Sequence, residues 1–206
     1  MHLYTFDSAP NPRRVGLFLL YKDVQLPTTQ IDMRQNEHRA DAFLAINPMG
    51  TLPALQTEED VLLTEVIAIC DYLDAHYPDK PLMGCSVLER ALVLAWDHRI
   101  FVSLFEPFAE MLRNRSPAFE NRALPGPVDI EQIPALEARG RKRFRATLEQ
   151  IELEIGDNSF LCGEQLTLAD IDLLVAVETA RWVKEELPAS STRLQAWAER
   201  TRAALA

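Results

Sequence analysis

The chain has 206 residues, a formal net charge of −10 at pH 7 and a hydrophobic content of 48%. This negative charge argues against nucleic acid or an anionic membrane as the main partner, because both repel an acidic protein. No secretory signal pattern is evident, and no apolar run approaches the roughly 18 residues that a membrane span needs. The 3 cysteines are widely spaced. They predict free thiols in a reducing cytoplasm and no metal site.

The first eighty residues alternate between strand and helix patterns. Residues 2–6 predict a strand, followed by a helix to about Lys22 with Pro12 at its first position and Asn11 as its N-cap. The later elements are a strand over 27–33, a short helix around 42–44, hairpin strands over 54–56 and 61–63, and a helix that begins at 64–65. The order β-α-β-α-β-β-α predicts a compact α/β module with a mixed sheet.

Residues 47–55 read N-P-M-G-T-L-P-A-L and predict a turn that leads into a strand. Leu52 precedes Pro53 and is therefore expected to be extended, with its backbone N–H and C=O available to a partner other than a neighbouring strand. Only about 5–6% of such bonds are cis. The residues alone therefore leave open an ordinary loop whose proline begins a strand.

After a linker over residues 79–85, every pattern is helical. Ser86 and Glu89 have the spacing of a capping box, which opens a long helix that Pro107 should kink or interrupt. An irregular connection over 114–134 and a helix over 134–155 follow. Thr167 and Asp170 form a second capping box before an almost entirely apolar helix, which we expect at the centre of the core. The last helix covers about 192–203. We therefore predict an α/β domain over 1–78 and an all-α domain over 86–206.

The whole pattern resembles the soluble glutathione transferase family, in particular its bacterial theta- and zeta-like members. The most specific pieces are F-L-x-x-N-P-x-G-T-L-P over residues 43–53, L-T-E-x-x-A-I over 63–69 and F-L-x-G-x-x-L-T-x-A-D over 160–170. The resemblance implies a thioredoxin-like domain, a helical domain, a homodimer with one active site per subunit, and glutathione as co-substrate. It also implies that the Leu52–Pro53 bond is cis.

The chemistry of such an enzyme requires a thiolate. A free thiol has a pKa near 8.5 and is mostly protonated at neutral pH, so donors must be aimed at its sulfur. The loop before the first helix, where free N–H groups favour an anion, can supply them. Asn11 and Ser8 are the candidate catalytic residues in that loop. Ala9 occupies the position where theta-, delta- and zeta-like members of the family have the activating serine, which is a departure from the family pattern. Asn11 is the better candidate, because the resemblance places it where zeta-like and several bacterial members have a second residue that faces the sulfur. An alternative is that Asn11 only caps the helix.

Carried over residue by residue, the resemblance implies five glutathione-binding residues, namely His38, Leu52, Pro53, Glu65 and Val66. Leu52, before Pro53, would pair its backbone with the cysteinyl part, and Glu65 would meet the γ-glutamyl amine. His38 would lie near the glycyl carboxylate. At Val66 the family usually has a serine that binds the γ-glutamyl carboxylate, so this chain lacks that hydroxyl.

The resemblance also implies an apolar pocket for a small hydrophobic electrophile, although aromatic residues at helical spacing more often belong to a core. The candidate pocket residues are Tyr4, Phe6, Phe101, Phe105, Phe108, Met111, Leu112 and Trp182. Three functions remain open: conjugation of glutathione to that electrophile; a non-catalytic ligand-binding or protein-interaction protein on the same fold; and a glutathione-dependent peroxidase, dehalogenase or ether-cleaving enzyme.

Overall fold

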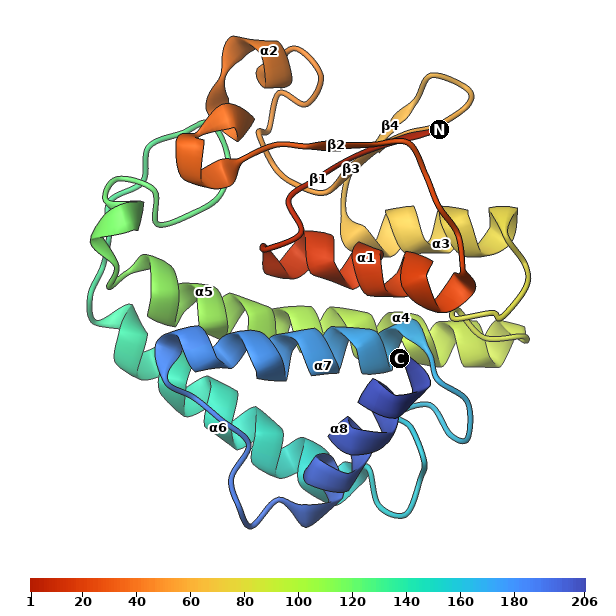
Figure 1. Cartoon of the computed structure of the whole chain (residues 1–206). Helices are drawn as coiled ribbons and strands as arrows, with labels where there is room; N and C mark the ends of the chain where they lie inside the picture. The colour runs from red at the N-terminus through yellow and green to blue at the C-terminus, as the bar shows by residue number, and fades with distance from the viewer. The chain divides into compact units, whose positions relative to one another are not determined.

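The computed structural model describes residues 1–206 and contains two compact units. The first consists of Met1–Lys80 together with the short segment Pro125–Val128, and the second of Pro81–Leu124 and Asp129–Ala206. Figure 1 shows the strands in the first unit and long helices in the second. No helix is both long and apolar enough to cross a membrane.

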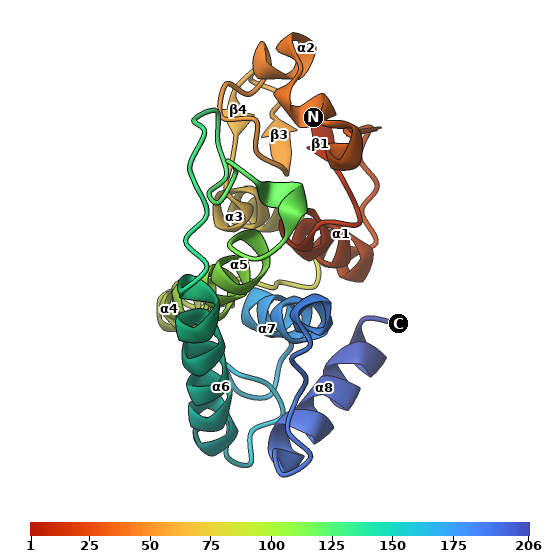
Figure 2. The ribbon, with the colours of Figure 1, turned by 90° about the vertical axis from the view of Figure 1, so that its left-hand side faces the viewer.

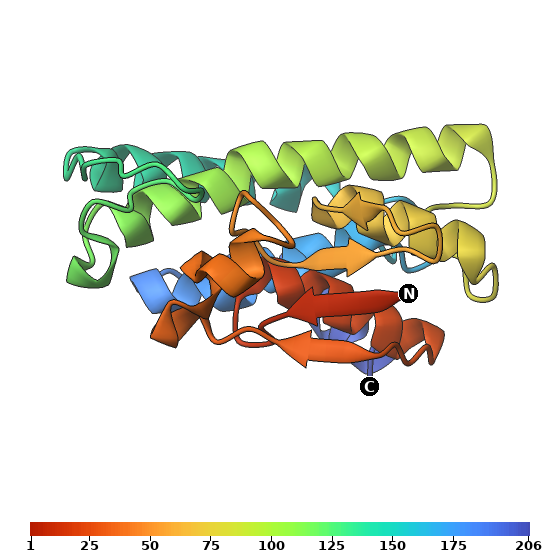
Figure 3. The ribbon, with the colours of Figure 1, turned by 90° about the horizontal axis from the view of Figure 1, so that it is seen from above.

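The first unit is a four-stranded mixed sheet with helices on its faces. Its elements are β1 (His2–Thr5), α1 (Pro10–Lys22), β2 (Thr28–Gln30), α2 (Asp41–Leu44), β3 (Ala54–Gln56), β4 (Leu62–Leu63) and α3 (Val66–His76). The strand order is β2-β1-β3-β4, with β1 parallel to β2 and the other pairs antiparallel. Figure 3 shows these strands side by side. The thioredoxin-like fold and the predicted β-α-β-α-β-β-α order are confirmed.

Successive side chains of β1 point to opposite faces of the sheet. Leu3 is buried, as are Phe18 of α1 and Ile69 of α3. Tyr4 faces the opposite way, and its ring lies 6.0 Å from that of Phe43 in α2, centroid to centroid. Figure 1 shows α1 and α3 on one side of the strands and α2 on the other. The sheet therefore has an α1/α3 layer and an α2 layer.

Two of the predicted boundaries in this unit are wrong. The first helix begins at Pro10, with Ala9 as the N-cap residue, so Asn11 lies inside the first turn rather than capping it. Proline suits this position because its fixed φ is already helical, and the N–H groups of a first turn have no partner within the helix. The second strand ends at Gln30, because Asp32 accepts a hydrogen bond from the backbone N–H of Arg34 and starts a 3-10 turn.

The second unit is all helical, as predicted. It contains α4 (Val87–Ile100), α5 (Glu106–Arg113), α6 (Leu136–Glu154), α7 (Leu168–Thr179) and α8 (Thr192–Ala204). Between α4 and α5 the chain forms a π-helical segment, Phe101–Phe105. Pro107 explains the expected interruption: it lacks an N–H, and its ring would collide with the carbonyl four residues earlier in a regular helix. Ser86 and Glu89 form the predicted capping box.

The core of the helical unit is built around α7. Asp170 is fully buried, and its carboxylate accepts hydrogen bonds from the backbone N–H groups of Leu161 and Thr167 and from Trp197 Nε1, at 2.8–3.0 Å. Burial raises the pKa of Asp170, while these hydrogen bonds oppose that rise. Figure 2 shows α7 between α6 and α8. The predicted capping box therefore connects the start of α7 to the loop before it and to α8.

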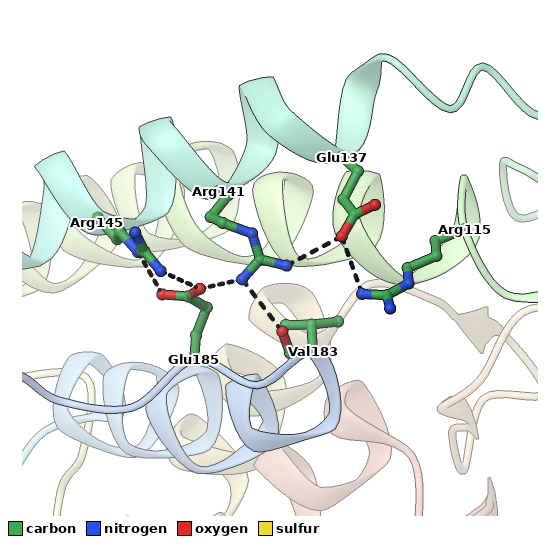
Figure 4. A network of polar contacts seen from close by, with 6 residues as sticks. All are labelled: Arg115, Glu137, Arg141, Arg145, Val183 and Glu185. Carbon is green, nitrogen blue, oxygen red and sulfur yellow. Dashed lines mark hydrogen bonds and ion pairs between the residues drawn. The ribbon is translucent and has the colours of Figure 1, made fainter.

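Charged side chains hold α6 against neighbouring segments of the helical unit (Figure 4). Glu185, which is buried, pairs with both Arg141 and Arg145, and Arg141 also reaches Glu137 at 3.1 Å. Burial opposes ionisation of Glu185, but the hydrogen bonds from the two arginines lower its pKa overall. Arg115 extends the network to Glu137 at 3.1 Å.

Candidate active site

The loop after β1 presents few backbone donors at the start of α1. The N–H of Ala9 donates to Phe6 O at 2.8 Å, and the N–H of Arg13 donates to Ala9 O at 3.0 Å. Pro10 and Pro12 have no N–H at all. Among the first N–H groups of the helix, which have no intrahelical acceptor, the backbone N–H of Asn11 is therefore the one left to bind an anion.

The side chain of Asn11 is oriented by Arg14. Arg14 Nη1 donates to Asn11 Oδ1 at 3.3 Å. Because a guanidinium only donates, the oxygen of the amide must face Arg14, and the Nδ2 group is directed elsewhere. Arg14 is 3% exposed, whereas Ser8, the other predicted catalytic residue, is exposed. The structure thus gives Asn11 both a backbone and a side-chain donor.

The loop itself is anchored to the neighbouring strand. Asp7 receives a hydrogen bond from Gln30 Nε2 at 2.8 Å, and the N–H of Asp7 donates to Gln30 Oε1 at 3.3 Å. Gln30 is the last residue of β2, which pairs with β1. The approach to α1 is therefore fixed by the sheet.

Asn47 holds the second loop of the candidate site. Its Nδ2 donates to the carbonyl oxygen of Thr51 at 2.8 Å, and its Oδ1 accepts from the N–H of Met49 at 3.1 Å. The Leu52–Pro53 bond is cis, as the resemblance implied. Leu52 precedes β3, so its N–H and C=O lie outside the registers of β3 with β1 and β4. The neighbouring strands therefore do not engage these two backbone groups.

Gly50 brings the turn that carries His38 against this loop. Its φ is +60°, and a Cβ built on it would lie 2.8 Å from the carbonyl oxygen of His38. Glycine is needed here for both reasons: the left-handed conformation and the missing side chain. His38 itself lies in the 3-10 turn Glu37–Arg39 and is half-buried. Two of the segments predicted to bind glutathione therefore meet at Gly50.

Glu65 has a strained backbone at the start of α3. Its φ is 66° and its ψ 124°, a combination that is rare for any residue other than glycine. Such outliers cost of order 1–3 kcal/mol and gather at functional sites. The side chain of Glu65 is exposed and makes no capping hydrogen bond. Val66 is buried and is the first residue of the helix, so its N–H has no acceptor within α3.

The residues predicted to bind the electrophile lie in different surroundings. In the first unit, the ring of Tyr4 lies against Phe43, and the guanidinium of Arg34 lies 5.3 Å from the ring of Phe6. In the helical unit, the side chains that are buried are Phe105, Phe108 and Met111.

The other three residues of this set keep more surface. Phe101 is 38% exposed, Trp182 is 56% exposed and Leu112 is half-buried. The ring of Trp182 lies 6.1 Å from that of Phe108, centroid to centroid. Phe101 and Trp182 therefore retain the most surface for contact with a ligand.

Arg14 is the residue of this region that the sequence did not reveal as important. A basic residue in the second turn of a helix is ordinarily a solvated charge. The only available signal is its i, i+3 spacing from Asn11, which places both side chains on one face of α1.

Two family models match the chain. The glutathione S-transferase N-terminal domain matches residues 9–76, and the glutathione S-transferase C-terminal domain matches residues 134–200. The first match includes α1 with Asn11, the loop with the cis-proline, and α3. The second includes α6, α7 and most of α8.

Two curated relatives and a solved structure are similar to the chain over most of its length. A maleylacetoacetate isomerase of Pseudomonas aeruginosa is 31% identical over 84% of this chain and 78% of its own length. The human glutathione S-transferase theta-2 is 30% identical over 94% of this chain and 77% of its own length. The crystal structure of a glutathione S-transferase domain-containing protein from Marinobacter aquaeolei superimposes with a TM-score of 0.90, at 25% identity and full coverage of both chains.

Proposed function

Since the chain belongs to the glutathione S-transferase family, we propose that it conjugates the thiolate of glutathione to a small hydrophobic electrophile. Glutathione is the co-substrate, held by the domain over residues 1–78. The observation that carries the proposal is the start of α1, where Asn11 combines a free backbone N–H with an amide whose oxygen faces Arg14. Hydrogen bonds from these two donors stabilise a thiolate, and Asn11 itself forms no covalent bond to the substrate.

In this proposal the tripeptide is bound by backbone as much as by side chains. The N–H and C=O of Leu52, before Pro53, pair with the cysteinyl part, as a strand pairs with its neighbour. The N–H of Val66 at the start of α3 meets the γ-glutamyl carboxylate. Glu65 meets the γ-glutamyl amine, and the strained backbone of Glu65 supports a binding role for this residue. His38 approaches the glycyl carboxylate.

Two residues of the proposed glutathione site lack hydroxyl groups that the family resemblance places there. Val66 removes a hydroxyl donor to a carboxylate, and a hydrogen bond to a charged group contributes about 1.5–3 kcal/mol. Its loss weakens binding by about ten- to a hundredfold. Ala9, as the N-cap residue of α1, has no hydroxyl for the sulfur. Asn11 is then the residue proposed to promote ionisation of the glutathione thiol, and Ser8, which is exposed, is the second candidate.

The electrophile is proposed to be hydrophobic, because the residues predicted to line its pocket are aromatic or aliphatic. Tyr4 and Phe6 come from the α/β unit, and Phe101, Phe105, Phe108, Met111, Leu112 and Trp182 from the helical unit. Phe101 and Trp182 are exposed, which favours them as the direct contacts. We also propose a homodimer, on the basis of the family.

The test is a conjugation assay with purified protein, millimolar glutathione and a panel of electrophiles that includes isothiocyanates. The expected product is a thioether whose mass is that of glutathione plus the electrophile, less any leaving group. Turnover should fall in Asn11→Leu, an isosteric change without donors, and should persist in Ser8→Ala. A panel without turnover, at glutathione concentrations shown to saturate the protein, would refute the proposed transfer reaction.

A second candidate function is a non-catalytic ligand-binding or interaction protein on the same fold. Val66 and Ala9 favour it, because each removes a hydroxyl from the site. This candidate predicts that glutathione binds without ionisation of its thiol, or does not bind. A peroxidase, dehalogenase or ether-cleaving reaction would also use the glutathione thiolate. The same assay distinguishes a peroxidase by its products, an alcohol with glutathione disulfide. Displacement of a halide or a phenol by the thiolate would give a thioether together with the released group.

A further inference from the structure

We propose that Arg14 is a positioning residue that fixes the side-chain amide of Asn11 with its Nδ2 group available to the sulfur of bound glutathione. This inference rests on the proposed function, and it adds a residue that no motif in the sequence identified. Arg14 does not touch the substrate in this account. It acts through one hydrogen bond, from its Nη1 to Asn11 Oδ1 at 3.3 Å.

The orientation of the amide decides whether Asn11 helps or opposes ionisation. An asparagine side chain has a donor end and an acceptor end of nearly the same shape. The Nδ2 end stabilises a thiolate by hydrogen bonding, while the Oδ1 end would place a partial negative charge beside it. An arginine has five N–H donors and no acceptor, so its contact with Asn11 selects one of the two orientations.

The location of Arg14 supports a role beyond the stability of α1. Its side chain is 3% exposed, which is unusual for a charged residue, whereas the adjacent Arg13 is half-buried. It lies near the positive end of the α1 dipole, where a cation is not favoured. Asn11 also carries the one backbone N–H that the two prolines leave in the first turn. The backbone N–H and the side-chain amide of Asn11 are therefore the two donors available to an anion, and Arg14 fixes the orientation of the side-chain amide.

Arg14 has a second effect that must be separated from positioning. As a cation near the sulfur it lowers the thiol pKa through charge alone. The charge effect persists when Asn11 is replaced, whereas the positioning effect requires the amide. A double-mutant cycle between Arg14→Met and Asn11→Leu distinguishes the two.

The experiment follows thiolate absorbance near 240 nm against pH for glutathione bound to four proteins: wild type, R14M, N11L and the double variant. N11L should raise the thiol pKa by about 1–2 units, as expected for the loss of one hydrogen bond to a charged group. R14M should raise it in the wild-type background and by clearly less in the N11L background. R13M removes the same charge from the adjacent position, and its shift should be equal in both backgrounds.

Equal shifts from R14M in the two backgrounds, or no shift, would overturn the positioning role while leaving the proposed function intact. If the wild type failed to bind or ionise glutathione, both would fall. Melting temperature and the KM for glutathione report on a merely structural role of Arg14. If Arg14 had only such a role, R14M would change these two values by the same amount in the wild-type and N11L backgrounds. Should R14M not fold, R14Q in both backgrounds gives the same cycle, since glutamine removes the charge and its amide also has an acceptor end.

Discussion

Replacement of Gly50 by alanine tests how the two glutathione-binding segments are held together. The left-handed conformation at φ +60° costs a residue with a Cβ roughly 1–2 kcal/mol. The new Cβ would also lie 2.8 Å from the carbonyl oxygen of His38, and overpacking of this kind typically costs about 1–3 kcal/mol. The total of about 2–5 kcal/mol is a large part of the 5–15 kcal/mol that stabilises a typical domain.

A matched control separates the two contributions. Gly156 has a φ of +55°, and a Cβ there would come no closer than 3.9 Å to any neighbour, the carbonyl oxygen of Glu154. Gly156→Ala should therefore show the conformational cost alone, about 1–2 kcal/mol. Both variants would be compared by urea unfolding and by calorimetric titration with glutathione.

Gly50→Ala should lose more stability than Gly156→Ala and should also bind glutathione more weakly, because the turn with His38 must move away from the loop with Leu52. Gly156→Ala should bind as the wild type does. If the two variants lost the same stability and bound glutathione equally well, the close approach at Gly50 would not shape the site.

Three further predictions concern the helical core, the ion-pair network and the glutathione site. Gly140→Ala should destabilise the helical unit by about 1–3 kcal/mol in thermal unfolding, because its Cβ would lie 2.6 Å from the carbonyl oxygen of Pro107. Glu185→Gln should lower stability by about 1.5–3 kcal/mol at neutral pH. The pKa of Glu185 is lowered in the folded protein, so its contribution to folding stability is complete above about pH 4.3, the ordinary pKa of a glutamate. That contribution disappears as the pH falls through the pKa of Glu185 in the folded state. The melting temperatures of the wild type and Glu185→Gln should therefore converge in acid. Val66→Ser should tighten glutathione binding about tenfold or more by calorimetry, because it restores a hydroxyl donor; an unchanged affinity would show that the backbone N–H suffices.

Local patterns predicted most of the fold. The two capping boxes, at Ser86 and Thr167, fix helix starts through contacts between residues three positions apart, so the sequence contains all the information needed. The hairpin of β3 and β4 follows from alternation around an acidic turn. The interruption before α5 follows from the missing N–H of Pro107. In each case the interactions that determine the structure join residues that are close together in the sequence.

The candidate site was less predictable, because it depends on tertiary contacts. Asparagine often caps helices, yet the first helix begins at Pro10, two residues before the predicted start, so Asn11 lies inside its first turn. The contact of Arg14 with Asn11 needs the buried packing of α1, which no pattern of charges reveals. The need for glycine at position 50 arises from the carbonyl of His38, twelve residues earlier in the chain. The cis bond before Pro53 was implied by the family resemblance rather than by the residues.

The proposed transfer reaction requires the start of α1 to ionise bound glutathione. The most direct test is calorimetric titration of the wild-type protein with glutathione, with thiolate absorbance near 240 nm followed against pH on the same samples. We expect binding at millimolar Kd or better and a thiol pKa below about 7.5, against about 8.5 for a free thiol. Binding with an unshifted thiol pKa, or no binding at millimolar glutathione, would contradict it.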